Sequence, residues 1–204
     1  SQLVRSPGVY FDRQQDRTSD KEVFGAKIIP SRGAWLEFEI DKKDQPQVRV
    51  DRKRKQSAIV FLMAIGMTKS EIAQAFKDYP LVLDALEKET LETQDEALVD
   101  LYRKIRPADT PTPEAGKNLL DSFYFNTKRY DLARVGRYKI NRKLGVEADF
   151  NDRSLHQEDI IATIKYLVAL HDGAATFPGK RNGEDVDLRV DVDDIDHFGN
   201  RRIR

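Results

Sequence analysis

Apolar and polar residues alternate along two short stretches in the first quarter of the chain. Residues 34–40 carry apolar side chains at the even positions and Trp35, Glu37 and Glu39 at the odd positions. Residues 47–51 repeat this alternation after a polar loop. Because successive side chains of a strand point to opposite faces of a sheet, the two stretches predict an antiparallel hairpin with one buried and one solvent-exposed face. Trp35, the only tryptophan, is predicted to lie on the exposed face.

The middle of the chain carries the sequence signals of helix ends. Thr68 and Thr93 are each followed three residues later by Glu, the capping-box pattern. Thr112 precedes Pro113, and proline is favoured at the first helical position. Gly145 fits the left-handed residue that commonly follows a helix. These signals and the apolar pattern predict helices at about residues 57–66, 68–78, 96–105, 113–123, 132–144 and 154–173.

The two ends of the chain are predicted to come together around this helical middle. Residues 174–188 are polar and contain glycine, as in a loop or small hairpin, and the tail 189–204 has alternating valines that we expect to rejoin the first sheet. The predicted fold class is therefore α+β, with an antiparallel sheet built from both chain ends and a helical middle segment. A single domain, 1–204, is expected, of the kind inserted into a longer chain. Its sheet part is assigned to residues 1–55 and 185–204, and its helical part to residues 56–173.

The composition limits what the chain can bind. It has 35 Lys and Arg against 35 Asp and Glu, a formal net charge of zero, so any nucleic-acid contact must come from a local patch. It has no cysteine, which excludes disulfides and thiolate ligands and fits a cytosolic protein. No apolar run approaches the roughly 20 residues of a membrane span.

The sequence predicts neither a metal site nor a catalytic centre. The three histidines, His156, His171 and His197, lack the spacing of zinc ligands. The acids that begin at Asp191 fail the pattern of a calcium loop, because Ile195 occupies a ligand position and no glycine follows it. A nucleophile-elbow motif and a glycine-rich phosphate loop are also missing.

A compact basic patch follows the predicted hairpin. Arg49, Arg52, Lys53 and Arg54 form it, and a solvated hairpin end is its ordinary interpretation. Trp35 on the exposed face favours nucleic acid instead, because an exposed indole can stack on an unpaired base, typically for about 1–3 kcal/mol. Burial of Trp35 under a neighbouring loop is the alternative.

Several long strings resemble one protein family. The tail DDIDHFGNRRIR combines acids, a Gly-Asn pair and arginines, and guanidinium groups suit phosphate oxygens or a guanine edge. Together with SQLVRSPGVYFD, IIPSRGAWLEFEI, VRVDRKRK and RYDLARVGRYKIN, it resembles the β subunit of bacterial multisubunit RNA polymerase, in the part known as the lobe domain. The strings occur in the family's order and run from the first residue to the last.

The resemblance implies a pocket for one unpaired base of the non-template DNA strand. In the family a base stacks on the tryptophan, and a guanine sits beside it, where an aspartate accepts from its N1–H and N2–H₂ groups and an arginine donates to its acceptors. The resemblance also places Gln2 on the rim of the rifamycin pocket, the rest of which lies outside this chain. The resemblance assigns the stacking role to Trp35. The residues that it places around the guanine pocket are Arg5, Asp51, Ile195, Asp196 and Arg201.

The resemblance further implies a role within a larger enzyme. The parent would be a DNA-directed RNA polymerase, a nucleotidyltransferase in the cytoplasm, whose Mg²⁺ ions are bound elsewhere. This domain is therefore expected to hold no cofactor and to be inactive alone. Its implied partners are the rest of β, the other polymerase subunits, DNA and σ factor, with no membrane contact. The alternative is a protein-docking module for σ or elongation factors with only incidental DNA contact.

The predicted helix 132–144 carries a stripe of basic residues that either hypothesis can use. It could face downstream DNA, σ factor or solvent, and solvent is the default for such a stripe. Its members are Arg134, Arg137, Lys139, Arg142 and Lys143.

Overall fold

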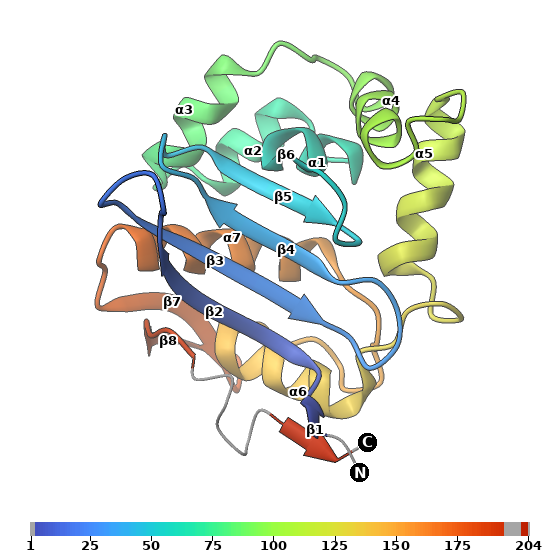
Figure 1. Ribbon diagram of the computed structural model, residues 1–204. Helices are drawn as coiled ribbons and strands as arrows, with labels where there is room; N and C mark the ends of the chain where they lie inside the picture. The colour runs from blue at the N-terminus through green and yellow to red at the C-terminus, as the bar shows by residue number, and fades with distance from the viewer. Residues whose placement is uncertain (1–2, 194–200, 204) are drawn as a thin grey trace.

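Five antiparallel strands form the central sheet of the structure, a computed structural model that describes residues 3–193 and 201–203 (Figure 1). The strands lie side by side in chain order. Leu36 faces Val50 across one strand pair and Phe38 faces Val48, so the apolar side chains share one face. The predicted hairpin and its buried face are thereby confirmed. The strands are β2 (Gly8–Gln15), β3 (Glu22–Ile29), β4 (Leu36–Ile40), β5 (Pro46–Val50) and β6 (Lys55–Ser57).

Helices fill the middle of the chain, and several begin at the predicted caps. Thr68 makes both hydrogen bonds of a capping box with Glu71. The side chains of Thr93 and Thr112 each accept a backbone N–H in the first turn of their helices, and Gly145 ends a helix with φ 66°. The elements are α1 (Ala58–Ala64), α2 (Lys69–Ala75), α3 (Pro80–Lys88), α4 (Gln94–Ile105), α5 (Pro113–Leu120), the π-helical turn η1 (Asp121–Phe125), α6 (Ala133–Leu144) and α7 (Gln157–His171).

The helices cover one face of the sheet and leave the other face open (Figure 1). α6 packs against β2, α7 against β3 and β4, and α1 against β5. The ring centroids of Phe11 and Tyr166 lie 4.2 Å apart and join β2 to α7, and Phe38 of β4 packs against Phe61 of α1. All four rings are buried, so the core lies between the sheet and the helices. The polar residues of the alternating strands face the open side.

The two ends of the chain pair with each other in a separate small sheet. β1 (Leu3–Arg5) runs antiparallel to β9 (Arg201–Ile203), with Arg5 opposite Arg201. The tail was expected to rejoin the first sheet, but that sheet ends at β2. Asp193 occupies the free edge of β2: its N–H donates to the carbonyl of Phe11 (2.8 Å), and its carboxylate accepts from the Phe11 N–H (2.8 Å). The α+β class and the pairing of the two ends are confirmed.

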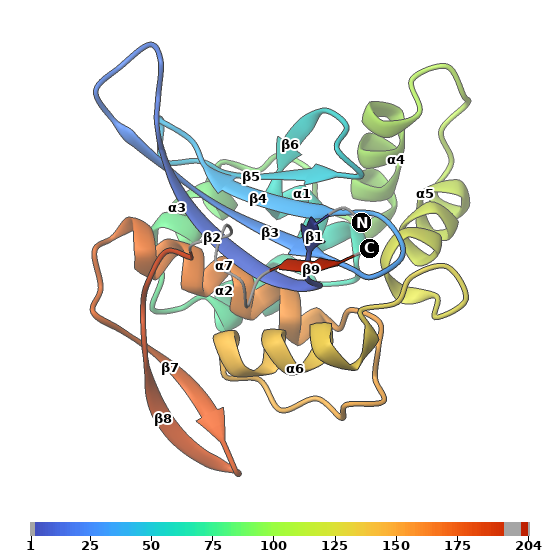
Figure 2. The same cartoon turned by 60° about the horizontal axis from the view of Figure 1, so that its bottom comes forward.

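A second hairpin projects from the helical layer. It consists of β7 (Thr176–Arg181) and β8 (Glu184–Arg189), as Figure 2 shows. The half of the hairpin near its turn is held against the end of α6, because the N–H of Lys180 donates to the carbonyl of Gly145 (2.8 Å). A Cβ atom on Gly145 would lie 2.7 Å from the Cα atom of Gly179, so this contact requires glycine. Phe177 and Leu188 anchor the hairpin in the core.

One member of the predicted basic stripe is part of the core. Arg137 of α6 is fully buried, and its guanidinium donates to both carboxylate oxygens of Asp159 in α7, at 2.8 and 3.0 Å. It also donates to the backbone carbonyls of Asp152 (2.7 Å) and Ser154 (2.6 Å). The expectation that this stripe faces solvent or a ligand is therefore wrong for Arg137, which joins two helices inside the core.

Within residues 3–193 and 201–203, no single helix is both long and apolar enough to cross a membrane. α1 and α2 meet those criteria only when taken as a pair, and they are bent by 116° relative to each other.

Candidate nucleic-acid interface

The loop that presents Trp35 is fixed at its first half to the start of α6. The N–H of Arg32 donates to the carbonyl of Asp131 (3.1 Å), and the N–H of Asp131 donates back to the carbonyl of Arg32 (2.8 Å). Gly33 follows with φ 123°, and a Cβ atom there would lie 2.8 Å from the ring of Tyr130. Both features require glycine, so the approach to Trp35 has little freedom.

A buried tyrosine fixes the other half of the site. The hydroxyl of Tyr124 donates to the carbonyl of Trp35 (2.8 Å), and the N–H of Asp51 points at both the Trp35 carbonyl (3.1 Å) and the Tyr124 hydroxyl (3.2 Å). Burial raises the pKa of Tyr124 well above its usual value, so the phenol keeps the proton that it donates. Tyr124 thereby joins Trp35 to Asp51, a contact that no pattern in the sequence predicts.

Asp51 and Arg52 form a tight turn after β5. Their φ angles are 51° and 59°, and the N–H of Lys53 donates to the carbonyl of Val50 (3.0 Å). Two successive left-handed residues are typical of the type I′ turn that matches the twist of a hairpin. Asp51 was predicted as the last residue of the strand, and the structure places it in this turn instead.

Two guanidinium groups lie over the Trp35 ring. The central carbon of Arg52 is 4.2 Å from the ring centroid, and that of Arg5 is 5.8 Å from it. The indole is partly exposed, and Arg52 is exposed. Cations are attracted to the face of an indole by its quadrupole. The alternative of a Trp35 buried under a loop is therefore excluded, because arginines cover the ring.

Of the predicted pocket residues, the structure describes Arg5, Trp35 and Asp51 with their side chains, and these three lie together. Arg5 reaches Trp35 from β1, and Asp51 is bonded to the Trp35 backbone. The backbone of Arg201 lies opposite Arg5, while its side chain lies outside the described part. Three further predicted residues, Gln2, Ile195 and Asp196, also lie outside the described residues.

The predicted basic patch divides between two environments. Arg52, Lys53 and Arg54 are exposed in the loop between β5 and β6. Arg49 lies in β5 on the open face of the sheet, where Glu37 is its cross-strand neighbour. That glutamate reduces the positive charge that Arg49 can offer to a ligand.

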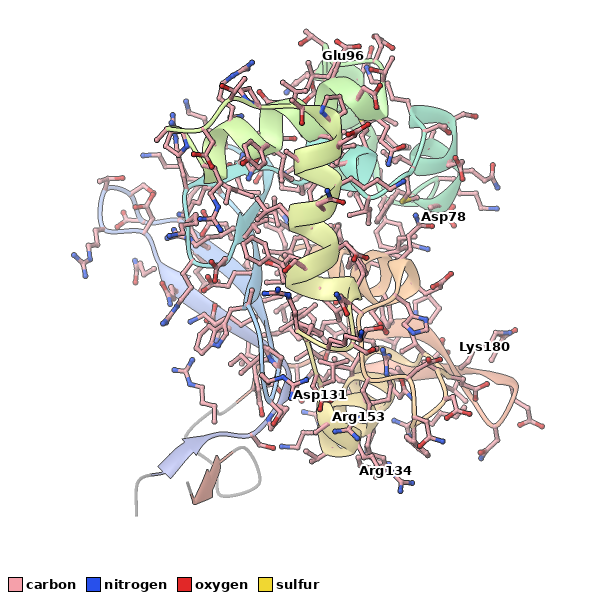
Figure 3. The ribbon with its side chains drawn as sticks, turned by 90° about the vertical axis from the view of Figure 1, so that its right-hand side faces the viewer. Asp78, Glu96, Asp131, Arg134, Arg153 and Lys180 are labelled. Atoms are coloured by element: carbon pink, nitrogen blue, oxygen red, sulfur yellow. The ribbon has the colours of Figure 1, made fainter. Side chains whose placement is uncertain are left out.

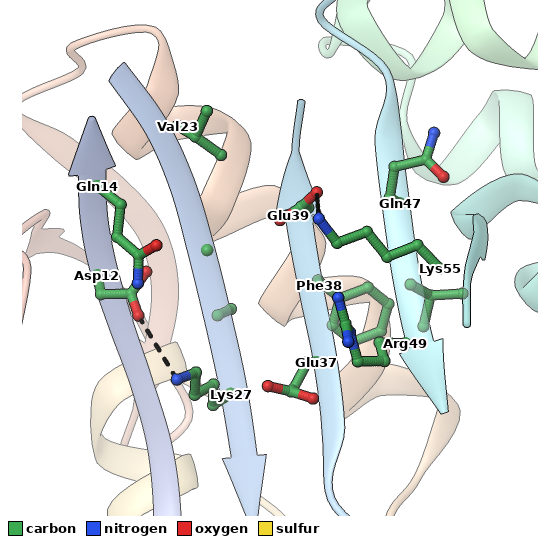
Figure 4. A pocket seen from close by; sticks show the side chains of 13 residues that line it. Asp12, Gln14, Val23, Lys27, Glu37, Phe38, Glu39, Gln47, Arg49 and Lys55 are labelled. Atoms are coloured by element: carbon green, nitrogen blue, oxygen red, sulfur yellow. Dashed lines mark ion pairs between the residues drawn. The ribbon is translucent and has the colours of Figure 1, made fainter. Parts of the chain in front are cut away.

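The open face around Arg49 is a shallow, charge-balanced hollow of about 230 Å³ (Figure 4). Lys55 forms an ion pair with Glu39 (2.6 Å), and Lys27 lies 4.0 Å from Asp12. Cations and anions alternate across the strands. We call Trp35 and the turn beside it, residues 51–54, the Trp35 turn. The Trp35 turn, rather than this face, therefore carries the uncompensated cations.

In the described part of the chain, no group of three or more His, Asp or Glu side chains is placed to hold a metal ion. The acid that precedes α6, Asp131, is engaged in an ion pair. Asp131 lies beside Arg153 (Figure 3), and the two side chains are 2.6 Å apart. Burial raises the pKa of Asp131, but hydrogen bonds from Arg153 and from the Ala133 N–H outweigh burial and bring the pKa below its usual value.

Comparisons with known proteins agree with the resemblance found in the sequence. Residues 5–178 match the family described as RNA polymerase Rpb2, domain 2. The whole chain is 88% identical to part of the DNA-directed RNA polymerase subunit beta of Bifidobacterium adolescentis, of which it covers 17%. It is 63% identical to the same subunit of Paenarthrobacter aurescens and 62% identical to that of Leifsonia xyli, and covers 18% of each. The chain thus spans less than a fifth of these relatives, and it belongs to the RNA polymerase Rpb2 domain 2 family, the lobe of the β subunit.

Proposed function

We propose that this chain lines one side of the DNA cleft in an RNA polymerase and contacts downstream DNA and the unpaired non-template strand. The observation that supports this proposal is the partly exposed Trp35 ring with Arg52 and Arg5 over it. Aromatic faces next to cations are the usual means of binding single-stranded nucleic acid, because bases stack and phosphates are neutralised.

In this proposal a base replaces Arg52 on the indole. The guanidinium lies 4.2 Å from the ring centroid, which leaves no room for a base between the two groups. When a strand enters, Arg52 leaves the ring and pairs with a phosphate nearby, while the base takes over the stacking contact. The turn backbone stays in place, because Tyr124 and Asp51 hold it from within.

Asp51 and Arg201 would provide preference for guanine. A carboxylate accepts from the N1–H and N2–H₂ groups of guanine, and an arginine donates to its acceptors, a combination that the other bases do not match. The Asp51 backbone is fixed beside Trp35, and Arg201 lies across from Arg5 in the β1–β9 sheet. A strand therefore meets the stacking ring and the guanine-reading groups together.

The catalytic chemistry would belong to the assembled enzyme. In the proposed setting, this chain works with the rest of β, the other subunits and σ factor in the cytoplasm. It positions DNA and contributes no group to nucleotidyl transfer. The magnesium ions of that reaction would be held by other parts of the polymerase.

Binding of labelled 12-nucleotide single strands to the 204-residue chain tests the guanine preference. Fluorescence anisotropy compares strands that differ only by one G-to-A change. The parent should prefer the G-containing strand, and Asp51→Asn and Arg201→Ala should each bind the two strands equally. Arg13→Ala is the control, because Arg13 lies in β2, where its partner is Glu22. The proposal fails if both site variants keep the parent's preference.

A further inference from the structure

A groove runs along the second half of α6, away from the Trp35 turn. It consists of two hollows. One, of about 440 Å³, lies between β2, α6 and β8, and the other, of about 410 Å³, lies between α6, the loop after it and the β7–β8 hairpin. Arg142 and Arg181 line both hollows, and Arg181 donates to the carbonyl of Arg142 (3.4 Å). The two hollows are therefore neighbours, and together we call them the α6 groove.

The first hollow has an excess of positive charge. Its acid, Asp193, is already engaged by Lys143 (2.9 Å) and by the N–H of Phe11 (2.8 Å). In the described part of the chain, neither Arg142 nor Arg181 has a carboxylate within 4.0 Å. The cations that line this hollow are Lys139, Arg142, Lys143, Arg181 and Arg189, of which Lys143 pairs with Asp193 and Arg189 pairs with Asp191 (3.1 Å).

The second hollow exposes large apolar side chains. Tyr138 is 49% exposed and Phe150 is 45% exposed, and their ring centroids lie 6.2 Å apart at a tilt of 41°. Val135, 43% exposed, does not line this hollow but lies one turn before Tyr138 on α6. Exposed apolar residues that gather in one place mark interaction surfaces, whereas single ones are ordinary.

The chemistry of the α6 groove fits a protein segment better than a nucleic acid. A single-strand site needs aromatic faces among its cations. In the α6 groove the exposed rings, Tyr138 and Phe150, line the second hollow, where the carboxylate of Glu147 would repel a phosphate. Tyr10, the ring in the positive hollow, is buried and its hydroxyl donates to the Ser6 carbonyl (2.6 Å), and the rest of the floor is aliphatic, from Val9 and Leu188. An apolar floor with a charged rim is instead the anatomy of a protein interface.

We propose that the α6 groove docks an acidic segment of another protein. Carboxylates of the segment pair with Arg142 and Arg181, where opposite charges select the partner and speed its association. An apolar or aromatic side chain of the same segment packs on Tyr138 and Phe150. This inference is independent of the base-stacking site, because none of its residues lies in the Trp35 turn.

The test uses polymerase assembled with a β subunit that contains this chain. The probe is a fluorescein-labelled 12-residue peptide in which Asp and Glu alternate with Leu and Phe, and binding is followed by anisotropy. The double variant Arg142→Glu, Arg181→Glu should weaken binding about tenfold or more, and Tyr138→Ser with Phe150→Ser should also weaken it. The charge-matched control is Arg103→Glu with Lys128→Glu, two exposed positions outside the groove.

Three results would overturn the proposal. The first is that the wild-type enzyme does not bind the peptide, for example because another part of the polymerase covers the groove. The second is that the charge-reversed variant binds the peptide as tightly as the wild type does. The third is that a 12-nucleotide single strand of thymidines binds the wild-type enzyme more tightly than the peptide does, and that the charge-reversed variant no longer binds this strand. That result would assign the groove to nucleic acid.

Discussion

Arg137 and Arg52 carry the same guanidinium group in two contrasting regions of the molecule. Arg137 lies fully buried between α6 and α7, and donates to the carboxylate of Asp159 and to two backbone carbonyls. Arg52 lies exposed in the turn after β5, over the ring of Trp35, and within the described residues it has no carboxylate within 4.0 Å. The fold supplies hydrogen-bond acceptors and a counter-charge to Arg137, whereas the described residues supply no counter-charge to Arg52.

The difference shows which charges are available for function. A buried, bidentate ion pair with further hydrogen bonds holds two helices in one arrangement, and no ligand can reach it. An exposed guanidinium on an aromatic ring is held weakly, by about 0.5–1 kcal/mol at exposed sites, so a base can displace it. The following substitutions separate the two roles, from the largest expected effect to the smallest.

Arg137→Met should lower the free energy of unfolding by about 3–5 kcal/mol, because it leaves the charge of Asp159 buried without a counter-charge. Urea unfolding of the 204-residue chain measures this loss. The double variant Arg137→Met, Asp159→Leu should recover part of it, since neither charge then remains. An Arg137→Met chain as stable as the parent would contradict the structural role.

Trp35→Ala should weaken single-strand binding by about 1–3 kcal/mol, because the stacking surface is lost. The free energy of unfolding should change much less than in Arg137→Met, since the indole is partly exposed. Anisotropy of a labelled strand gives the affinity, and urea unfolding gives the stability. Equal affinities of parent and variant would remove Trp35 from the site.

Tyr124→Phe should cost about 1 kcal/mol of stability, the net value of a typical hydrogen bond. Its hydroxyl is shared between the Trp35 carbonyl and the Asp51 N–H, so the variant also loosens the turn and should reduce the preference for guanine. Tyr102→Phe is the matched control, because that hydroxyl contacts Asp109 in an exposed position. If both variants kept the full guanine preference, Tyr124 would have no positioning role.

Asp131 should give the smallest effect, visible only in acid. Its pKa in the folded chain is below the usual value, so the ionised carboxylate stabilises the fold above about pH 4, its ordinary pKa. That stabilisation is lost as the pH falls through the lower pKa of the folded state. Asp131→Asn should therefore flatten the decline of stability below about pH 4, measured by urea unfolding at several pH values. Asp20→Asn, exposed in the loop before β3, controls for the loss of one carboxylate.

Local patterns predicted the parts of the fold that depend on neighbouring residues. The alternation at 34–40 predicted β4 and its exposed face, and the caps at Thr68, Thr93 and Thr112 predicted three helix starts. α3 was missed, because Tyr79 precedes its first residue and makes no side-chain cap.

Contacts between distant residues could not be predicted in the same way. Tyr124 bonds to a carbonyl 89 positions earlier, and no spacing in the sequence indicates such a contact. Arg137 and Arg142 both belong to one basic stripe, yet only packing against α7 decides that Arg137 is buried while Arg142 is exposed. The convergence of Arg5 and Trp35 came from the family resemblance, not from periodicity.

The fluorescence of Trp35 tests the central claim most directly, because it is the only tryptophan of the chain. The 204-residue chain is titrated with a 12-nucleotide single strand and, in parallel, with a strand of the same length that has sugars and phosphates but no bases. The account predicts saturable quenching by the first strand and little change with the second, since a base must stack on the indole in place of Arg52. Equal responses to both strands would show that only phosphates are bound, and would contradict a base-stacking site.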